Sequence, residues 1–171
     1  MTAAGAGAVL IAVISDTHMS RGRRRLPDRC VEIVSSADLV IHAGDFVTEE
    51  ALLEIETLGP PLAGVYGNMD EPALLRSLPA ERTIDAEDAS IAVLHDAGPR
   101  QGRLERLRLR FPEADAVVFG HSHIPLHEKD GGFQIFNPGS PTDRRRAPSH
   151  TMGVARVSGG NVSFELIVLD T

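Results

Sequence analysis

The stretch from Val9 to His18 reads Val-Leu-Ile-Ala-Val-Ile-Ser-Asp-Thr-His. Its first seven residues, Val9–Ser15, form an apolar run that predicts a strand covered on both faces, as in a parallel sheet. The run ends at once in the polar residues Asp16, Thr17 and His18. Ligand sites of open α/β sheets gather beyond the carboxyl ends of parallel strands, so this ending predicts site residues at a sheet edge.

Short apolar runs and helical stretches alternate along the rest of the chain, with no internal repeat. Helices are expected over Pro27–Ser36, Thr48–Leu58, Pro72–Leu78 and Gly102–Phe111. Strands are expected over Val9–Ser15, Asp38–Ala43, Leu62–Tyr66, Arg82–Ala86, Ser90–His95 and Ala116–Phe119, followed by a strand-rich tail over Ile124–Val168. A parallel βαβα half followed by an antiparallel half predicts an α/β domain with two sheets or one large mixed sheet.

The composition is that of one folded domain. The 171 residues are 42% hydrophobic and 24% charged, with a net charge of −7. This profile excludes disordered, collagen-like and coiled-coil proteins, and the negative charge argues against general nucleic-acid binding. We expect a single domain over residues 1–171, with residues 1–7 as a small-residue tail. No apolar run approaches the roughly 20 residues that span a bilayer, so no membrane segment is expected.

The only cysteine is Cys30, which excludes a disulfide framework and a cysteine-based zinc cluster and fits a reducing compartment. It falls inside a predicted helix, where we expect it to pack as a small hydrophobe. The apolar run Ala8–Ile14 has no preceding Lys or Arg, so a secretory signal is not expected. The predicted location is the cytoplasm.

Polar side chains follow the ends of five predicted strands. They are Asp16 and His18, then Asp45, then Asn68 and Asp70, then His95, and finally His121 and His123. Glycines precede Asp45, Asn68 and His121, and we expect them to let the backbone turn sharply. Oxygen and imidazole donors without thiolate suit Mn, Fe, Zn, Ni or Co rather than a structural zinc or a calcium cage. The donors exceed the needs of one ion, which predicts two ions sharing a carboxylate.

These motifs, in their order along the chain, resemble the signature of the calcineurin-like metallophosphoesterase superfamily. The matching residues are Asp16-x-His18, Gly44-Asp45, Gly67-Asn68-x-Asp70, His95 and Gly120-His121-x-His123. The small size and the segment Asn137-Pro138-Gly139-Ser140, expected to form a tight turn under the site, resemble its compact prokaryotic phosphodiesterase branch. The resemblance extends from about Val9 to the C-terminus. It implies an α/β fold, a four-layer α-β-β-α sandwich of two mixed sheets with a metal site at the strand ends.

The resemblance also implies how two divalent ions would be held. Asp16, His18 and His123 would bind one ion, Asn68, His95 and His121 the other, and Asp45 would bridge them. A hydroxide held between the ions would attack a phosphodiester in line while the ions neutralise the phosphate oxygens. Asp45, Asn68 and His95 would thus also be catalytic, and Asp70 would orient a ligand. Capping of the helix that starts at Pro72 explains Asp70 equally well.

The leading functional hypothesis is a phosphodiesterase that uses two transition-metal ions, with Mn²⁺ as the expected activator, on a small phosphodiester. A phosphomonoesterase with the same metal centre is the first alternative. A non-catalytic binding scaffold is another, because a eukaryotic retromer subunit resembles this fold without a competent site, whereas all the donors are present here. A nuclease acting on long DNA normally brings added domains, for which 171 residues leave no room. The sequence is also compatible with a homo-oligomer.

Many relatives carry histidine where this chain has Met69, in the Gly-Asn-His-Asp/Glu form of the motif. That histidine lies near the scissile phosphate and protonates the leaving oxygen, a contribution of roughly 10²–10⁴ in rate. Met69 has no proton to give. The sequence therefore predicts a preference for diesters with good leaving groups.

Several other polar residues carry weaker signals. We expect His42 to be a packed, hydrogen-bonded core histidine, and His150 to lie at the surface. His127 fits either the rim of the site or an exposed strand position. The basic runs Arg21–Arg25 and Arg144–Arg146 interrupt an acidic chain; solvated loops or an oligomer contact explain them better than a phosphate-attracting rim.

Overall fold

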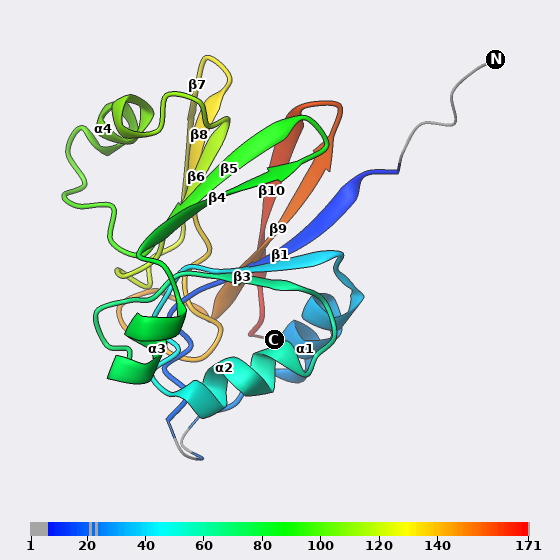
Figure 1. Ribbon diagram of the computed structural model, residues 1–171, viewed down its shortest axis with the longest axis vertical. Helices are drawn as coiled ribbons and strands as arrows, with labels where there is room; N and C mark the ends of the chain where they lie inside the picture. Colours follow the sequence, from blue (N-terminus) through cyan, green and yellow to red (C-terminus); the bar gives the residue numbers. More distant parts are fainter. Residues whose placement is uncertain (1–6, 21, 23, 171) are drawn as a thin grey trace.

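The computed structural model of the chain describes residues 7–20, 22 and 24–170. Two β-sheets pack face to face, and the helices lie on their outer sides (Figure 1). Most of the expected tail and two residues of the first basic run, Arg21 and Arg23, fall outside the described residues. None of the helices in the described part of the chain has both the length and the apolar character needed to cross a membrane.

The first sheet has the strand order β10-β9-β1-β2-β3. Its strands are β1 (Val9–Ile14), β2 (Leu39–His42), β3 (Leu62–Gly64), β9 (Thr151–Ser158) and β10 (Asn161–Val168). The first three are parallel to one another, whereas β9 runs antiparallel to β1 and forms a hairpin with β10. The first sheet is therefore mixed.

The second sheet has the order β4-β5-β6-β8-β7. Its strands are β4 (Glu81–Ala86), β5 (Ala89–Leu94), β6 (Ala116–Val118), β7 (Leu126–Asp130) and β8 (Phe133–Asn137). The prediction of an antiparallel second half is wrong in part. β5, β6 and β8 are parallel, as their burial on both faces favours, and the C-terminal hairpin joins the first sheet. Of the two predicted arrangements, two separate sheets are confirmed.

The helices of the described residues lie within the predicted ranges. They are α1 (Asp28–Ser36), α2 (Glu49–Glu56), α3 (Pro72–Ser77) and α4 (Arg103–Arg110). The side chain of Thr48 caps α2 by accepting a hydrogen bond from the Ala51 N–H, and two glutamates occupy the first turn. Proline opens α3, where its missing N–H costs nothing.

Three hydrophobic clusters separate four layers. Alternate residues of β1 point to opposite faces, so Ile11 and Val13 join the core between the sheets, while Ala12 and Ile14 pack under α1 and α2. A third cluster lies between the second sheet and α4, around Leu107. This is the α-β-β-α sandwich that the family resemblance implies. Cys30 lies on the buried face of α1 as expected, and burial raises the pKa of its thiol to about 12.

The third strand is shorter than predicted, ending at Gly64 instead of Tyr66. The Val65 N–H still donates to the His42 carbonyl, but the Tyr66 N–H donates to Pro79 outside the sheet. The chain therefore leaves the ladder two residues early. This departure turns Tyr66 away from the core and toward the sheet edge that carries the polar residues.

Candidate metal centre

The polar loops at the strand ends have an unusual backbone. Five of the predicted ligands have positive φ angles: Asp16 (56°), His18 (43°), Asp45 (63°), His121 (72°) and His123 (62°). Left-handed backbone at such residues costs on the order of 1–3 kcal/mol each and persists where the surrounding structure enforces it. Here the loops hold one another, since the His18 N–H donates to the Asp45 carbonyl and the Asp16 N–H to the Gly44 carbonyl. Strain of this kind clusters at functional sites.

The glycines of the motifs serve two different purposes. Gly44 has a φ of +99°, so it makes the sharp turn that the sequence predicts. For Gly67 and Gly120 the turn prediction is wrong, because neither has a positive φ. A Cβ at Gly67 would overlap the Asp45 carboxylate, and one at Gly120 would overlap Asp16 and its neighbour Ser15. These two glycines are needed because the loops pass so close to the carboxylates.

The most buried part of the centre joins Asp16, His18 and His123. Asp16 Oδ1 lies 3.4 Å from His123 Nε2 and 4.0 Å from His18 Nε2. All three atoms are buried and have no hydrogen-bond partner among the described residues. The Nδ1 atom of His123 faces the Asp143 carbonyl, which can only accept, so Nδ1 carries the proton and Nε2 presents a lone pair. Unpaired lone pairs that converge in a buried space need a positive charge between them.

Asp45 connects this part of the centre to the next. Its Oδ2 atom lies 3.3 Å from His18 Nε2 and 3.2 Å from His95 Nε2. The His95 Nδ1 atom donates to the Ala43 carbonyl at 2.7 Å, so its Nε2 atom is the one turned to the centre. Asn68 Oδ1 lies 2.9 Å from this Nε2 atom and 3.1 Å from His121 Nδ1. Asn68 and the His121 side chain are exposed and form the open side of the centre.

The pKa shifts of these groups show that the buried carboxylates of the centre lack a neighbouring positive charge. Burial raises the pKa of Asp16 and lowers that of His123. Burial also acts on Asp45, but the adjacent imidazoles of His18 and His95 outweigh it and lower its pKa below the ordinary value. Burial alone would lower the pKa of His95. The carboxylates of Asp45 and Asp16 have the larger effect together and raise that pKa to about 8. A proton on His95 supplies part of the charge that a cation would supply.

The donor set fits a metal ion. Two overlapping groups, Asp16 with His18 and His123, and Asp16 with Asp45 and His95, each bring their ligand atoms within 4.8 Å of one another. Mixed carboxylate and imidazole donors without thiolate are those of transition-metal sites. The structure thus brings all seven predicted ligands to one place, from the strand ends of both sheets.

Asp70 ties two of the ligand loops together. Its carboxylate accepts hydrogen bonds from the N–H groups of Asp45 (3.1 Å), Val47 (2.6 Å) and Gly67 (2.7 Å). The helix-capping interpretation is wrong, because Glu71 occupies the N-cap position of α3 and makes no side-chain cap. Asp70 therefore positions Asp45 through the backbone.

The segment Asn137–Ser140, at the end of β8, contacts two of the ligand loops. The Asn137 amide donates to the Gly120 carbonyl at 3.0 Å, and its Oδ1 atom accepts from the Gly139 N–H at 2.9 Å. The Ser140 hydroxyl donates to the Asp16 carbonyl at 2.8 Å. These contacts hold the first ligand loop against the last.

His42 is a packed core histidine, as predicted. It is fully buried and stacks on Phe46 with ring centroids 3.5 Å apart. The Gly44 N–H donates to Nδ1, so the proton resides on Nε2, which donates to the Thr17 hydroxyl at 3.0 Å. Burial lowers the pKa of His42 to about 3, which keeps the ring neutral. It therefore holds the loop of Asp16 and His18 against the loop of Asp45.

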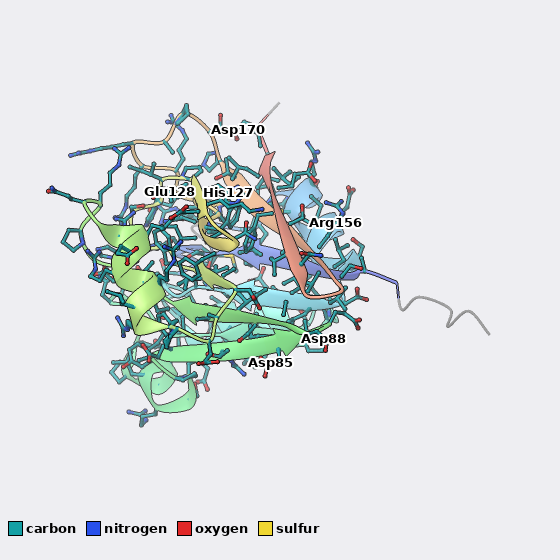
Figure 2. The ribbon with its side chains drawn as sticks, turned by 90° about the horizontal axis from the view of Figure 1, so that it is seen from above. Asp85, Asp88, His127, Glu128, Arg156 and Asp170 are labelled. Carbon is teal, nitrogen blue, oxygen red and sulfur yellow. The ribbon has the colours of Figure 1, made fainter. Side chains whose placement is uncertain are left out.

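The remaining histidines lie elsewhere. His127 is an exposed residue of β7 that contacts Gln134 and the rings of Phe136 and Phe164, so its strand position explains it (Figure 2). His150 pairs with Asp170 at 2.8 Å near the C-terminal end of the chain.

Parts of the two basic runs meet beside the centre. Arg24 and Arg145 both pair with the carboxylate of Asp143, at 3.5 and 3.8 Å. The Asp143 carbonyl accepts a hydrogen bond from His123 Nδ1, so these arginines flank the loop that orients that imidazole. Other residues of the runs, such as Arg25, are solvent-exposed.

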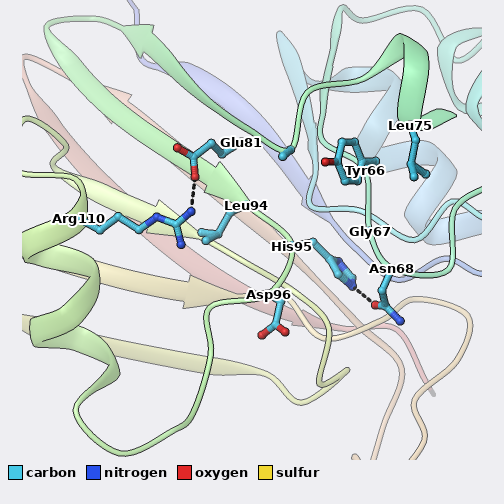
Figure 3. A pocket seen from close by; sticks show the side chains of 10 residues that line it. Tyr66, Gly67, Asn68, Leu75, Glu81, Leu94, His95, Asp96 and Arg110 are labelled. Atoms are coloured by element: carbon cyan, nitrogen blue, oxygen red, sulfur yellow. Dashed lines mark hydrogen bonds and ion pairs between the residues drawn. The ribbon is translucent and has the colours of Figure 1, made fainter.

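A pocket that the sequence did not predict adjoins the open side of the centre. It encloses about 310 Å³ and shares Asn68 and His95 with the centre (Figure 3). Its other walls include Tyr66, Leu94 and Arg110. The available signals were that Tyr66 directly precedes Gly67-Asn68 and that Leu94 directly precedes His95. Arg110 has no such signal, because the fold alone brings α4 to this edge.

The comparison with known proteins bears on this geometry. The family model of the calcineurin-like phosphoesterase superfamily domain matches residues 9–160. The chain belongs to this superfamily. It is 32% identical over 161 residues to a protein of Methanothermobacter thermautotrophicus named a probable metallophosphoesterase, covering 93% of this chain and 92% of that one.

Two further proteins extend the comparison. A phosphodiesterase of Methanocaldococcus jannaschii is 29% identical over 144 residues, which cover 75% of this chain and 82% of the relative. The structure of Vps29 from Cryptosporidium parvum superposes with a TM-score of 0.78 at 18% identity, covering 95% of this chain and 100% of the other. At that identity the likeness extends to the fold alone. The superfamily is one of phosphoesterases, and the grouped donors provide for its metal dependence.

Proposed function

We propose that this chain is a metal-dependent phosphodiesterase that holds two divalent transition-metal ions, with Mn²⁺ the preferred activator. The observation that carries the proposal is the position of Asp45. Its Oδ2 atom lies almost equally far from His18 Nε2 and His95 Nε2, at 3.3 and 3.2 Å, as a carboxylate shared by two ligand sets requires.

Asp16, His18 and His123 would hold one ion, and Asn68, His95 and His121 the other. When bound, such ions lower the pKa of a water toward neutrality and neutralise developing charge on a phosphoryl group. The N–H of Met69 donates to Asp45 Oδ1 at 2.8 Å and leaves Oδ2 facing the centre. Asp70 fixes the backbone of Asp45, and the Ala43 carbonyl fixes the His95 ring.

The open side of the centre would receive the phosphate. Asn68 is exposed there, and Met69 beside it is 54% exposed and apolar. Met69 can neither attract a second charge on the phosphate nor protonate a leaving oxygen. Both properties favour a diester, which carries one negative charge, with a leaving group of low basicity. The phosphodiesterase from Methanocaldococcus jannaschii supports the same choice.

The test is hydrolysis by metal-stripped protein reconstituted separately with Mn²⁺, Zn²⁺, Ni²⁺, Co²⁺ or Fe²⁺. The substrates are bis(4-nitrophenyl) phosphate and 4-nitrophenyl phosphate, which share a leaving group. We expect kcat/KM to be higher for the diester and highest with Mn²⁺. A higher value for the monoester would make the chain a phosphomonoesterase. No hydrolysis with any ion, in protein that binds the ions, would make it a binding scaffold.

A further inference from the structure

The pocket beside the metal centre has the position of a substrate subsite. It shares Asn68 and His95 with the centre, so one small molecule can place its phosphate at the centre and another group in the pocket. Its volume of about 310 Å³ lies at the lower end of the range of small-ligand pockets, roughly 300–1,000 Å³. Figure 3 shows the Asn68–His95 pair and the Glu81–Arg110 pair on different sides of it.

Its walls between these two pairs are mainly apolar. Tyr66 is partly buried, Leu94 is buried, and Leu75 is 46% exposed although it is large and apolar. An exposed apolar wall next to polar groups is typical of a ligand site. A tyrosine ring between leucines suits a flat aromatic group, because stacked aromatic rings attract one another beyond the effect of their buried area.

The charged pair of Glu81 and Arg110 gives the pocket a polar edge. The two side chains are about half exposed, and Arg110 Nη2 contacts Glu81 Oε2. The other carboxylate oxygen and the other guanidinium nitrogens make no hydrogen bond to the described residues. An acceptor and a donor therefore stand side by side. The edge of a nucleobase carries donors and acceptors in the same way, which a hydrocarbon ring does not.

The charge of the pocket argues for a neutral ring. Asp96 also lines the pocket; it is 61% exposed and its Oδ2 atom lies 3.9 Å from His121 Nε2, so the lining holds two carboxylates and one guanidinium. A second phosphate would be repelled there, whereas an uncharged heteroaromatic ring is not.

We propose that this pocket binds a nucleobase-like heteroaromatic ring of the substrate, with its flat face on Tyr66 and its edge on Glu81 and Arg110. The inference rests on the proposed phosphodiesterase function and narrows it to small nucleotide diesters.

Tyr66 provides a direct probe, because the chain has one tyrosine and no tryptophan. Protein labelled with 3-fluorotyrosine will give one ¹⁹F resonance, from Tyr66. The experiment titrates protein loaded with Zn²⁺, a diamagnetic ion, with adenosine 5′-monophosphate, 4-nitrophenyl phosphate and glycerol phosphate. The nucleotide should shift the resonance strongly, the nitrophenyl ester more weakly, and glycerol phosphate not at all.

Two variants with matched controls distinguish contacts to the edge of the bound ring from contacts to its face. Arg110→Gln should weaken binding of the nucleotide about tenfold, which is the contribution of one hydrogen bond to a charged group. It should leave the affinity for 4-nitrophenyl phosphate unchanged. Its control is Arg108→Gln on the same helix, since Arg108 pairs with Glu105 and Asp130 away from the pocket. Leu75→Lys should weaken both ring ligands, whereas Leu53→Lys, at a residue 53% exposed on α2, should weaken neither.

The same variants define the kinetic test on Mn²⁺-loaded enzyme. Arg110→Gln should raise KM for thymidine 5′-(4-nitrophenyl phosphate) about tenfold with little change in kcat, and leave KM for methyl 4-nitrophenyl phosphate unchanged.

Three results would decide against part of the proposal. A resonance that moves with neither ring ligand, in protein that hydrolyses diesters, overturns the subsite and leaves the proposed function standing. A resonance that moves with the nucleotide in protein that hydrolyses no diester supports the ring pocket and overturns the proposed function. Equal responses to both ring ligands, insensitive to Arg110→Gln, overturn the nucleobase assignment.

Discussion

The two sides of the metal centre differ in burial and in what determines them. On the closed side Asp16 and His123 are fully buried, and their facing atoms have no hydrogen-bond partner among the described residues. On the open side Asn68 and His121 are exposed, and the unpredicted pocket begins beside them. The closed side is thus built to hold charge, and the open side to admit a ligand. Substitutions on the two sides should therefore fail in different ways.

The largest effect is expected for Asp45, which links the two sides. Asp45→Asn keeps the shape of the side chain but removes the charge between His18 and His95. We expect kcat/KM for bis(4-nitrophenyl) phosphate to fall by about 10³-fold, the upper range for removing one charge-stabilising group. Asn68→Ala on the open side should cost less. A chelator-treated Asp45→Asn protein that kept its activity would contradict the mechanism, provided that its circular dichroism matches the wild type.

The second prediction concerns the open side only. Met69→His places a proton donor where the side chain is 54% exposed, beside Asn68. General acid catalysis should then raise the rate for alkyl esters by about 10²-fold and leave aryl esters nearly unchanged. The measurement is the slope of log kcat/KM against leaving-group pKa in a phosphodiester series. A wild-type slope that is already flat, with chemistry rate-limiting, would mean that another acid is present.

The third prediction compares how much the closed and the open side of the centre contribute to stabilisation by metal ions. Saturation with Mn²⁺ at about 100 times its Kd should stabilise the fold by about 2.7 kcal/mol. For a domain of this size that corresponds to roughly 5–10 °C in melting temperature. His123→Ala should abolish most of this shift, and His121→Ala should leave most of it. Equal losses from the two substitutions would mean that the closed side has no special share in metal binding.

The contrast also explains how far the sequence could predict this molecule. Apolar runs that end in Asp16, Asp45 and His121 predicted both the strands and the meeting of their ends, because parallel strands present their carboxyl ends to one edge. The pairing of the C-terminal hairpin with β1 was missed, since strand periodicity carries no information about partners.

The pocket was missed for a related reason. Glu81 and Arg110 meet across 29 positions of sequence on elements that carry no motif. They line one pocket because an ion pair joins β4 to the end of α4, which no local pattern encodes. Asp70 shows the intermediate case: the motif located it, but only its three backbone contacts distinguish positioning from capping.

The smallest expected effect comes from His42, which supports the closed side from within the core. Burial lowers its pKa to about 3, whereas the unfolded chain has an ordinary value of about 6.5. The unfolded state therefore binds a proton below pH 6.5 and the folded state does not, so stability must fall as the pH falls through that value. Between pH 7 and pH 5 the loss from this one group is about 2 kcal/mol, at 1.36 kcal/mol per pKa unit. In His42→Asn the amide oxygen can still accept from the Gly44 N–H, but the group that titrates is gone. Urea unfolding of metal-free protein should therefore show a pH dependence about 2 kcal/mol shallower in the variant than in the wild type over this interval. Equal pH dependences would mean that His42 takes up a proton in the fold, and the neutral clamp between the loops of Asp16 and Asp45 would be wrong.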